Sequence, residues 1–407
     1  MIDSNKIRAQ FPSLQRKHNG LPIIFLDGPG GTQVPHCVID AISGYYKTSN
    51  SNTHGEFITT RETDGLIENA RKAIAMLLGA EGPETISIGQ NMTTLNFSLA
   101  HGIARILKPG DEILITQLDH EGNRGPWLML REYGINVREV QLKQDGTLDY
   151  DDLTSKVNEN TRLVAMGMAS NALGTVNNIK LARQLCYRYN AWLLLDAVAY
   201  APHFCIDVQS IGCDFLLCSS YKFYGPHAGI LYSRPGLLDR VPTDRLHTNM
   251  QTAPYCIETG TLNHATIAGI LAAVNFISSL GDTEISRLSI IKGFEQLGAH
   301  EYSLATRLYE GLKKISGIKL IGQDFSSPQR APTVSFTVEG ATALQMCKHL
   351  SEKNICAWDG HFYALRAIQV LGLLEKGGVT RFGISVYNTA EEIDFVLSEV
   401  ESFTRSI

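Results

Sequence analysis

Short apolar stretches and longer segments of mixed polarity alternate along the chain between about residue 84 and residue 234. The apolar stretches have the length of strands, and several of the segments between them have the length of helices. Nearly continuous apolar strands separated by helices are typical of a mostly parallel sheet that is covered on both faces. We expect strands at 84–90, 111–118, 136–142, 161–170, 191–200, 213–220 and 228–234, and helices at 93–107, 125–134 and 179–190.

The pattern changes after about residue 285. A long helical segment at 289–315 is followed by a strand-like stretch at 331–340, and the chain closes with a strand at 380–388 and a helix at 389–403. This order is typical of a smaller α+β domain. We therefore predict three parts: an N-terminal segment of residues 1–25, a large α/β domain of residues 26–284 and a small C-terminal domain of residues 285–407.

Composition narrows the classes of protein that fit this pattern. The chain has 407 residues and a formal net charge of -5 with no basic block, so we expect neither nucleic acid nor an anionic membrane as a partner. Residues 1–20 are charged and lack the apolar core of a secretory signal. The longest apolar run, at 265–278, is too short to cross a bilayer and is expected to be a buried helix. The eight cysteines are scattered, which favours reduced thiols in a cytoplasmic protein and no zinc site.

Polar side chains recur at the carboxyl ends of the predicted strands. Right-handed crossovers bring these ends to one edge of the sheet, where ligands bind in open α/β sheets. An aspartate that ends an apolar strand is costly to bury unless a cation meets it. A lysine at an apolar edge can have a lowered pKa and act as a nucleophilic amine. The polar residues at this edge are His120, Asn171, Asp196, Ser219 and Lys222.

The turn SIGQNMTT (87–94) follows a predicted strand and opens a helix, so its backbone N–H groups can hold an anion. An amine, a carboxylate and an anion site together suit pyridoxal phosphate, which has an aldehyde, a ring nitrogen and a phosphate. Each signal has another explanation when taken singly. Lys222 could be a surface lysine in a turn, Asn171 a turn residue, Asp196 a helix cap and His120 a hydrogen-bonded core histidine. A Rossmann nucleotide site also competes, but no GxGxxG follows an early strand.

An ordered series of motifs extends over nearly the whole chain. In order and spacing these motifs resemble the class V aminotransferases, a family of fold-type-I pyridoxal phosphate enzymes, and within it the cysteine desulfurase and selenocysteine lyase branch. The resemblance implies an α/β fold with a mostly parallel sheet and a smaller α+β C-terminal domain, pyridoxal 5'-phosphate as cofactor and a small amino acid as substrate. The motifs are FLDGPGGTQVP (25–35), LDHEGNRGPW (118–127), ASNALGTVNNI (169–179), LLLDAVAYAPH (193–203), SSYKFYGPHAG (219–229), ETGTLNHATIAG (258–269) and TRFGISVYNTAEEID (380–394).

The resemblance assigns roles by position around the cofactor ring. Lys222 matches the lysine that bonds the cofactor aldehyde, and Asp196 matches the carboxylate that keeps the pyridine nitrogen protonated. His120 matches the imidazole that stacks on the ring and shuttles protons. Asn171 matches the amide that bonds the phenolic oxygen, and Ser219 matches a phosphate ligand.

The phosphate turn differs in residue type from the family pattern. Asn91 and Met92 stand where the family often has two threonines, and Thr93 offers a hydroxyl donor beside their backbone N–H groups. Thr261 matches a threonine that reaches the phosphate from the neighbouring subunit. The resemblance therefore implies a homodimer.

Two further departures concern residues around the ring and the phosphate. Ala199 stands where a glutamine usually helps to bind the phenolic oxygen, which leaves that task to Asn171 alone or to Tyr200. Tyr221 stands directly before the lysine, where the family has a histidine, and its phenol can still donate to the phosphate.

The substrate side of the site is less defined by the motifs. Arg381 matches the arginine that grips the substrate carboxylate with two donors, the alternative being a surface arginine at the start of a strand. The stretches WDGHFY (358–363) and NTHGEF (52–57) are expected to line the substrate pocket, with His54 as a further substrate-binding candidate.

The most consequential departure concerns sulfur chemistry. Tyr363 stands at the position of the persulfide-forming cysteine of the desulfurases, and Trp358 stands where an arginine is often found. Cys356 is near in sequence, but it ends an expected strand. A phenol cannot carry sulfur as a persulfide, because that chemistry needs a thiolate. The leading hypothesis is therefore cleavage of a Cβ–S or Cβ–Se bond without the usual relay cysteine. Aminotransferase, epimerase and regulatory cofactor-binding functions are the alternatives.

Overall fold

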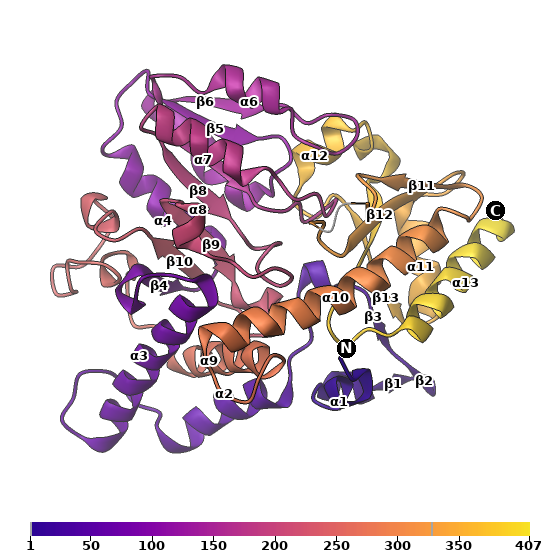
Figure 1. The fold of residues 1–407 in the computed structure, drawn as a ribbon, viewed down its shortest axis with the longest axis horizontal. Helices are drawn as coiled ribbons and strands as arrows, with labels where there is room; N and C mark the ends of the chain where they lie inside the picture. The colour runs from indigo at the N-terminus through magenta and orange to yellow at the C-terminus, as the bar shows by residue number, and fades with distance from the viewer. Residues whose placement is uncertain (1, 327–328) are drawn as a thin grey trace.

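The computed structural model describes residues 2–326 and 329–407. Its largest element is a seven-stranded sheet with the strand order β4-β10-β9-β8-β7-β5-β6 (Figure 1). Strands β5 to β9 pair in parallel, and β10 alone runs antiparallel to both of its neighbours. The mostly parallel α/β fold is thereby confirmed. The strands are β4 (Ile86–Gly89), β5 (Glu112–Thr116), β6 (Asn136–Val140), β7 (Thr161–Gly167), β8 (Trp192–Asp196), β9 (Phe215–Ser219) and β10 (Gly229–Ser233).

The reversal at β10 has a local cause. Only residues 220–228 connect β9 to β10, which is too short for the crossover that a parallel pairing needs. The connection therefore turns back tightly. At Gly225 a Cβ atom would lie only 2.9 Å from Ser220 Cβ, so the turn has room for glycine alone. Lys222 lies inside this turn.

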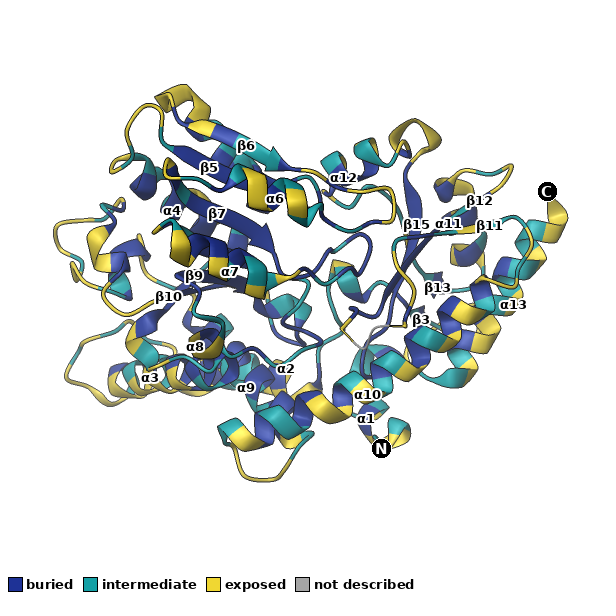
Figure 2. Cartoon of the chain, turned by 45° about the horizontal axis from the view of Figure 1, so that its top comes forward, coloured by how far each residue is buried: buried dark blue, intermediate teal, exposed yellow. Residues whose placement is uncertain are grey.

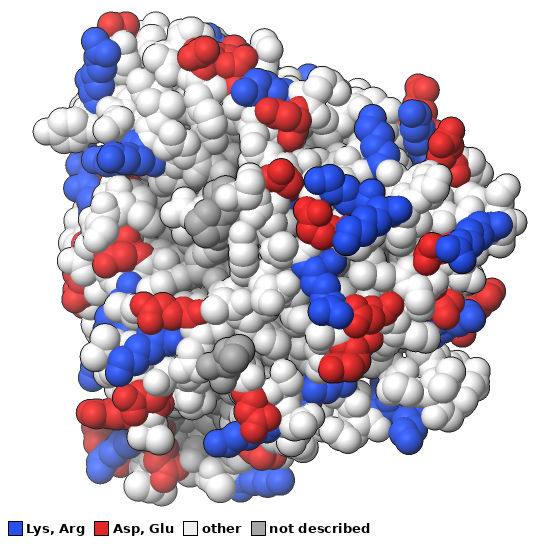
Figure 3. Space-filling model, turned by 45° about the vertical axis from the view of Figure 1, so that its right-hand side comes forward, with Lys and Arg blue, Asp and Glu red and all other residues white. Residues whose placement is uncertain are grey.

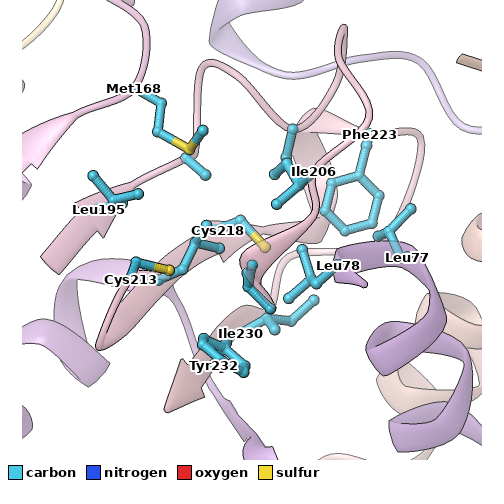
Figure 4. Close-up of a cluster of buried hydrophobic side chains, with 14 of the residues drawn as sticks. Leu77, Leu78, Met168, Leu195, Ile206, Cys213, Cys218, Phe223, Ile230 and Tyr232 are labelled. Carbon is cyan, nitrogen blue, oxygen red and sulfur yellow. The ribbon is translucent and has the colours of Figure 1, made fainter. Parts of the chain in front are cut away.

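Apolar residues alternate between the two faces of the large sheet. Leu193 and Leu195 of β8 contribute to one buried cluster, and Leu194 contributes to a second cluster on the opposite face. Both faces are therefore covered, as the uninterrupted apolar strands predict, and the central strands appear dark in Figure 2, while the edge strand β6 and the outer helix faces are partly exposed. Figure 4 shows part of the first cluster, where Cys213 and Cys218 lie among carbon side chains.

Helices cover the sheet on both sides. The segment predicted as one helix at 125–134 is instead a short α-helix followed by a 3-10 helix, and it ends at Gly134, whose φ is 77°. No helix within residues 2–326 and 329–407 is long and apolar enough to cross a membrane. The helices are α1 (Ser4–Arg8), α2 (His36–Thr48), α3 (Ile58–Leu78), α4 (Met92–Ala104), α5 (Gly125–Leu128), α6 (Tyr150–Lys156), α7 (Ile179–Arg188), α8 (Val208–Ile211) and α9 (His264–Ser279).

The C-terminal part forms a second, four-stranded antiparallel sheet in the order β11-β12-β15-β14. The long helix α10 runs from the helices α9 and α3 to this smaller sheet (Figure 1). On the face shown in Figure 3, acidic and basic side chains are interspersed. The elements are α10 (Arg287–Leu312), β11 (Ile318–Ile321), β12 (Thr333–Val338), α11 (Ala343–Glu352), β14 (Trp358–Gly360), α12 (Leu365–Val370), β15 (Val379–Gly383) and α13 (Ala390–Ser406).

The N-terminal residues join the second sheet region. Strand β3 (Ile24–Phe25) pairs in parallel with β13 (Ile355–Cys356), and Asp27 forms a bridge with Gly383. The 3-10 turn Gly28–Gly30 follows directly, so it is placed between the two sheets. A short hairpin of β1 (Lys17–His18) and β2 (Leu21–Pro22) precedes it.

Candidate functional site

A cavity of about 680 Å³ lies at the carboxyl ends of the parallel strands and extends to the smaller sheet. Its wall includes the turn Gly28–Gly30 and residues that follow β5, β7, β8 and β9. The cavity brings together ten of the twelve residues predicted from the sequence: Asn91, Met92, Thr93, His120, Asn171, Asp196, Ser219, Tyr221, Lys222 and Arg381.

Lys222 reaches the cavity from the turn after β9. Its amine donates a hydrogen bond to the Pro29 carbonyl and lies 4.8 Å from the centre of the Tyr221 ring. Burial, reinforced by the nearby positive charge of Arg381, lowers the pKa of Lys222 to about 7. A substantial share of this amine is therefore uncharged and nucleophilic at neutral pH.

Asp196 ends β8 inside the cavity wall. Its Oδ1 accepts a hydrogen bond of 2.9 Å from the Val198 amide, and this turn ends the strand before residue 200, which the sequence pattern had included. Burial raises the pKa of Asp196 to about 6, although the hydrogen bond from the Val198 amide and the charge of Lys222 both lower it. A cationic group bound in the cavity would lower that pKa and hold the carboxylate ionised.

Asp119 is a second buried carboxylate that the sequence analysis missed. Its Oδ1 accepts a hydrogen bond of 2.7 Å from Gly167, and its Oδ2 accepts one of 3.3 Å from the Asn123 amide. Burial raises the pKa of Asp119 to about 7, and the charge of Asp196 raises it further. The available signal was its position, directly after an apolar strand and directly before His120.

His120 lies on the adjoining turn with a defined protonation pattern. Its Nδ1 accepts a hydrogen bond of 2.9 Å from the Gly122 amide, so the proton of the neutral ring is on Nε2. Burial lowers the pKa of His120 to about 4, and the charges of Lys222 and Arg381 lower it further. The imidazole is therefore neutral at physiological pH.

Asn171 and Arg381 lie together on the side of the smaller sheet. Arg381 donates a hydrogen bond of 2.9 Å to the backbone carbonyl of Asn171. The side-chain amide of Asn171 donates one of 2.8 Å to the backbone carbonyl of Phe362. The amide oxygen of Asn171 and Nε of Arg381 are buried without a hydrogen-bond partner among the described residues. Such atoms are costly to bury, so a ligand group that satisfies them would be stabilised.

Arg381 remains charged despite its burial. Burial lowers its pKa to about 9, and the carboxylate of Asp27 opposes this shift. Asp27, which the sequence analysis did not single out, belongs to the FLDGPGG stretch, and burial raises its pKa. The Arg381 guanidinium also lies 3.9 Å from the centre of the Phe362 ring.

The far end of the cavity is suited to an anion. Asn91 caps the N-terminus of α4 by accepting a hydrogen bond of 2.9 Å from the Thr94 amide, and the first-turn residues Met92 and Thr93 line the cavity. A side chain at Gly229 would overlap the Asn91 backbone, so glycine allows β10 to contact this helix end. A helix N-terminus offers free N–H groups and a positive dipole end to a phosphate.

His227 is a further cavity residue that the sequence analysis did not name. Its ring stacks on Tyr221 with centres 4.5 Å apart and planes 8° apart. His227 also lines a neighbouring cavity of about 840 Å³, which contains Thr261. Its place in SSYKFYGPHAG, five residues after Lys222, was the available signal.

Thr261 and His54 do not line the main cavity of this single chain. Thr261 is exposed in the neighbouring cavity. His54 is exposed on the surface, with Nδ1 3.4 Å from Asp64 Oδ1. The role of Thr261 across a subunit interface and the substrate contact of His54 both stay predictions.

The stretch 358–363 forms the outer wall of the cavity through Trp358, Phe362 and Tyr363. No cysteine is among the described residues that line this cavity. Cys356 pairs in β13 with β3, as a strand residue, and burial raises the pKa of its thiol to about 11. A thiol with a raised pKa is a poor nucleophile near neutral pH.

Several known proteins resemble this chain in sequence and in fold. The family model for aminotransferase class-V matches residues 24–396. A cysteine desulfurase from Synechococcus elongatus is 31% identical over 98% of this chain, which spans only 63% of that protein. A cysteine desulfurase from Salmonella gallinarum is 31% identical, over 96% of this chain and 95% of its own length. The apo structure of a cysteine desulfurase from Thermococcus onnurineus superposes with a TM-score of 0.89 at 25% identity, covering 100% of this chain and 99% of that one.

Proposed function

Because the chain belongs to the class V aminotransferase family, we propose that it is a pyridoxal phosphate-dependent enzyme of the cysteine desulfurase-like group. Its substrate is a small amino acid with sulfur or selenium on Cβ, and its reaction breaks the bond between Cβ and that atom. The observation that carries the proposal is the combination of Lys222 and Asp196 in a cavity whose described lining residues include Tyr363 and no cysteine.

The residues present fit the cofactor. The amine of Lys222 would bond its aldehyde, the carboxylate of Asp196 would meet its ring nitrogen, and the N-terminus of α4 with Ser219 would hold its phosphate. When bound, pyridoxal phosphate withdraws electrons from Cα of an amino acid and so weakens the bonds around that carbon. The unpartnered amide oxygen of Asn171 marks a further polar contact.

The chain's own groups then have distinct tasks. Arg381, charged and buried, grips the substrate α-carboxylate and fixes which Cα substituent faces Lys222. The uncharged amine of Lys222 takes the Cα proton. The neutral His120 carries a proton on Nε2 and can donate it to a departing sulfur.

The residues that line the cavity also determine how the bond between Cβ and sulfur is broken. A relay mechanism needs a cavity thiolate to attack the substrate sulfur, and none of the described lining residues supplies one. The available route is elimination, in which the Cα proton leaves to Lys222 and the Cβ–S electron pair leaves with sulfur. With water, one substrate yields one thiol, pyruvate and ammonium. A better leaving group speeds this route. Cystine, which releases a persulfide, is therefore expected to be turned over faster than cysteine.

The test compares cystine and cysteine as substrates while pyruvate, sulfide and keto acids are measured. Pyruvate from cystine with no protein-bound persulfide on trapped enzyme supports the proposal. Cys356→Ala should retain activity within about twofold, since its thiol is held in a strand, and the equally half-buried Cys205→Ala is the matched control. Stoichiometric persulfide on Cys356 with activity lost only in Cys356→Ala would refute it. A keto acid that retains the side chain would indicate an aminotransferase instead.

We also infer a homodimer in which Thr261 reaches the partner's phosphate site. The exposure of Thr261 in a cavity that shares His227 with the main cavity supports this arrangement. Sedimentation of the holoenzyme together with cofactor affinity of Thr261→Ala tests it. A monomer, or a dimer whose cofactor affinity is unchanged, would contradict it.

A further inference from the structure

Three aromatic side chains form the outer wall of the cavity beside Arg381. Trp358 on β14 is directly opposite Arg381 on β15, so the two side chains share one face of the smaller sheet. The Phe362 ring lies against the Arg381 guanidinium, and Tyr363 follows it. The group that would grip the substrate carboxylate is therefore flanked by rings. We call Trp358, Phe362 and Tyr363 the aromatic wall.

The aromatic wall is held in an unusual backbone shape. Phe362 and Tyr363 have φ angles of 53° and 58°, in the left-handed region that side chains other than glycine rarely adopt. Three contacts hold them there: Asn171 Nδ2 to Phe362 O at 2.8 Å, the Glu121 amide to Tyr363 O at 2.7 Å, and the Tyr363 amide to His361 Nδ1 at 3.2 Å. Two of these contacts come from loops of the large sheet. The rings are therefore positioned by the site itself, which is typical of functional segments.

Two of the rings leave much of their surface open. Tyr363 is 68% exposed and Trp358 is 52% exposed, although both line the cavity. The Tyr363 ring is centred 5.5 Å from the His120 ring. The nearby carboxylate of Glu121 is paired with Arg124 at 3.1 Å. The exposed ring faces of Tyr363 and Trp358 are flat and apolar, and the tyrosine hydroxyl and the indole N–H are the polar groups of these two side chains.

We propose that the substrate carries an aromatic group on its sulfur, as in an S-aryl cysteine, and that Tyr363 and Trp358 select for it. The inference rests on the proposed Cβ–S cleavage. With the carboxylate at Arg381, the sulfur substituent extends toward the aromatic wall, where rings stack favourably. The chemistry agrees, since an aryl thiolate spreads its charge over the ring and leaves more readily. One S-aryl cysteine and one water give one aryl thiol, pyruvate and ammonium.

The test uses the holoenzyme with S-phenyl-cysteine and S-methyl-cysteine. Calorimetric Kd values measure the ring preference without requiring turnover, and thiol and pyruvate release measures kcat/KM. The wild-type enzyme should bind the phenyl compound more tightly. Tyr363→Ala and Trp358→Ala should each reduce that preference about three- to tenfold, the worth of one aromatic pair. Tyr363→Phe should keep it, and Tyr187→Ala, on an exposed tyrosine of α7, is the matched control.

The two measurements separate the two proposals. Equal Kd values for both compounds in the wild type, or a ratio unchanged in Tyr363→Ala and Trp358→Ala, would overturn the inference. Tight, ring-dependent binding without thiol release would uphold the inference about the aromatic wall and refute the proposed cleavage.

Discussion

The two ends of the cavity differ in how firmly the fold specifies them. The inner end consists of residues on or just after strands that are buried on both faces, and Asp196 and Ser219 are 7% and 2% exposed. The outer end consists of the aromatic wall, of which Tyr363 is 68% exposed. A change at the inner end disturbs a packed sheet, whereas a change at the outer end alters a surface. In the proposed function, the inner end therefore fixes the type of chemistry and the outer end is free to set the substrate.

Removing the amine at the inner end has the largest expected effect. Lys222→Ala should abolish the visible absorption of the lysine-bound cofactor and lower turnover of every substrate about a thousandfold or more. Absorbance measures the loss of the lysine-bound cofactor, and product assays measure the loss of turnover. Lys180→Ala, on the exposed face of α7, is the control. A borohydride-reducible adduct that survives in Lys222→Ala would show that another lysine bonds the cofactor.

Removing one charge at the inner end has the next largest effect. Asp196→Asn should retain the fold and lower turnover about ten- to hundredfold for all substrates alike, since a charge-assisted hydrogen bond is worth about 1.5–3 kcal/mol. Circular dichroism checks that the fold is retained, and steady-state kinetics measure the loss of turnover. If only S-aryl substrates were affected, the division of the cavity into two functional ends would be wrong.

Arg381 lies at the boundary between the two ends of the cavity, against the Phe362 ring. Arg381→Lys keeps a positive charge but loses the two-pronged donor, so KM for amino acids should rise about tenfold. Amines that lack the carboxylate should be unaffected, and cofactor affinity should hardly change. An equal loss for amino acids and decarboxylated amines would mean that Arg381 does not grip the carboxylate.

The smallest effect concerns pH at the inner end. The pKa of Lys222 is lowered to about 7, so its uncharged form declines as pH falls below that value. The rate of cofactor uptake by apoprotein should fall about fivefold between pH 7 and pH 6, as the uncharged share of a group with this pKa does, and level off above pH 7. Stopped-flow absorbance measures this profile. A rate that kept rising to pH 10 would show that Lys222 has an ordinary pKa.

Sequence patterns predicted the inner end residue by residue, but the outer end only as the pocket-lining stretch 358–363. Parallel strands align their carboxyl ends, so Asn171, Asp196 and Lys222 had to meet once β7, β8 and β9 were recognised. The outer end depends on the left-handed turn at Phe362 and Tyr363, which hydrogen bonds from distant loops impose. Hydrophobic periodicity says which face a residue occupies, and it carries no information about such contacts.

Hydrophobic periodicity also carries little information about which strands pair when they are far apart in the sequence. The reversal of β10 follows from a short connection, but the pairing of β3 with β13 joins residues 24 and 355, which are 355 − 24 = 331 positions apart. Two-residue strands leave no periodic signal. Asp119 and Asp27 were missed for a related reason, since a buried carboxylate looks like any other acidic residue until its surroundings are known.

The pairing of β3 with β13 also sets an order for synthesis of the protein. At roughly 5–20 residues per second, the ribosome makes Cys356 tens of seconds after Phe25. Until then the turn Gly28–Gly30, whose Pro29 accepts the hydrogen bond from Lys222, lacks the strands β13 and β15 that pair with the residues just before it. The large sheet can form during translation, but its reactive lysine is enclosed only when the nascent chain is nearly finished.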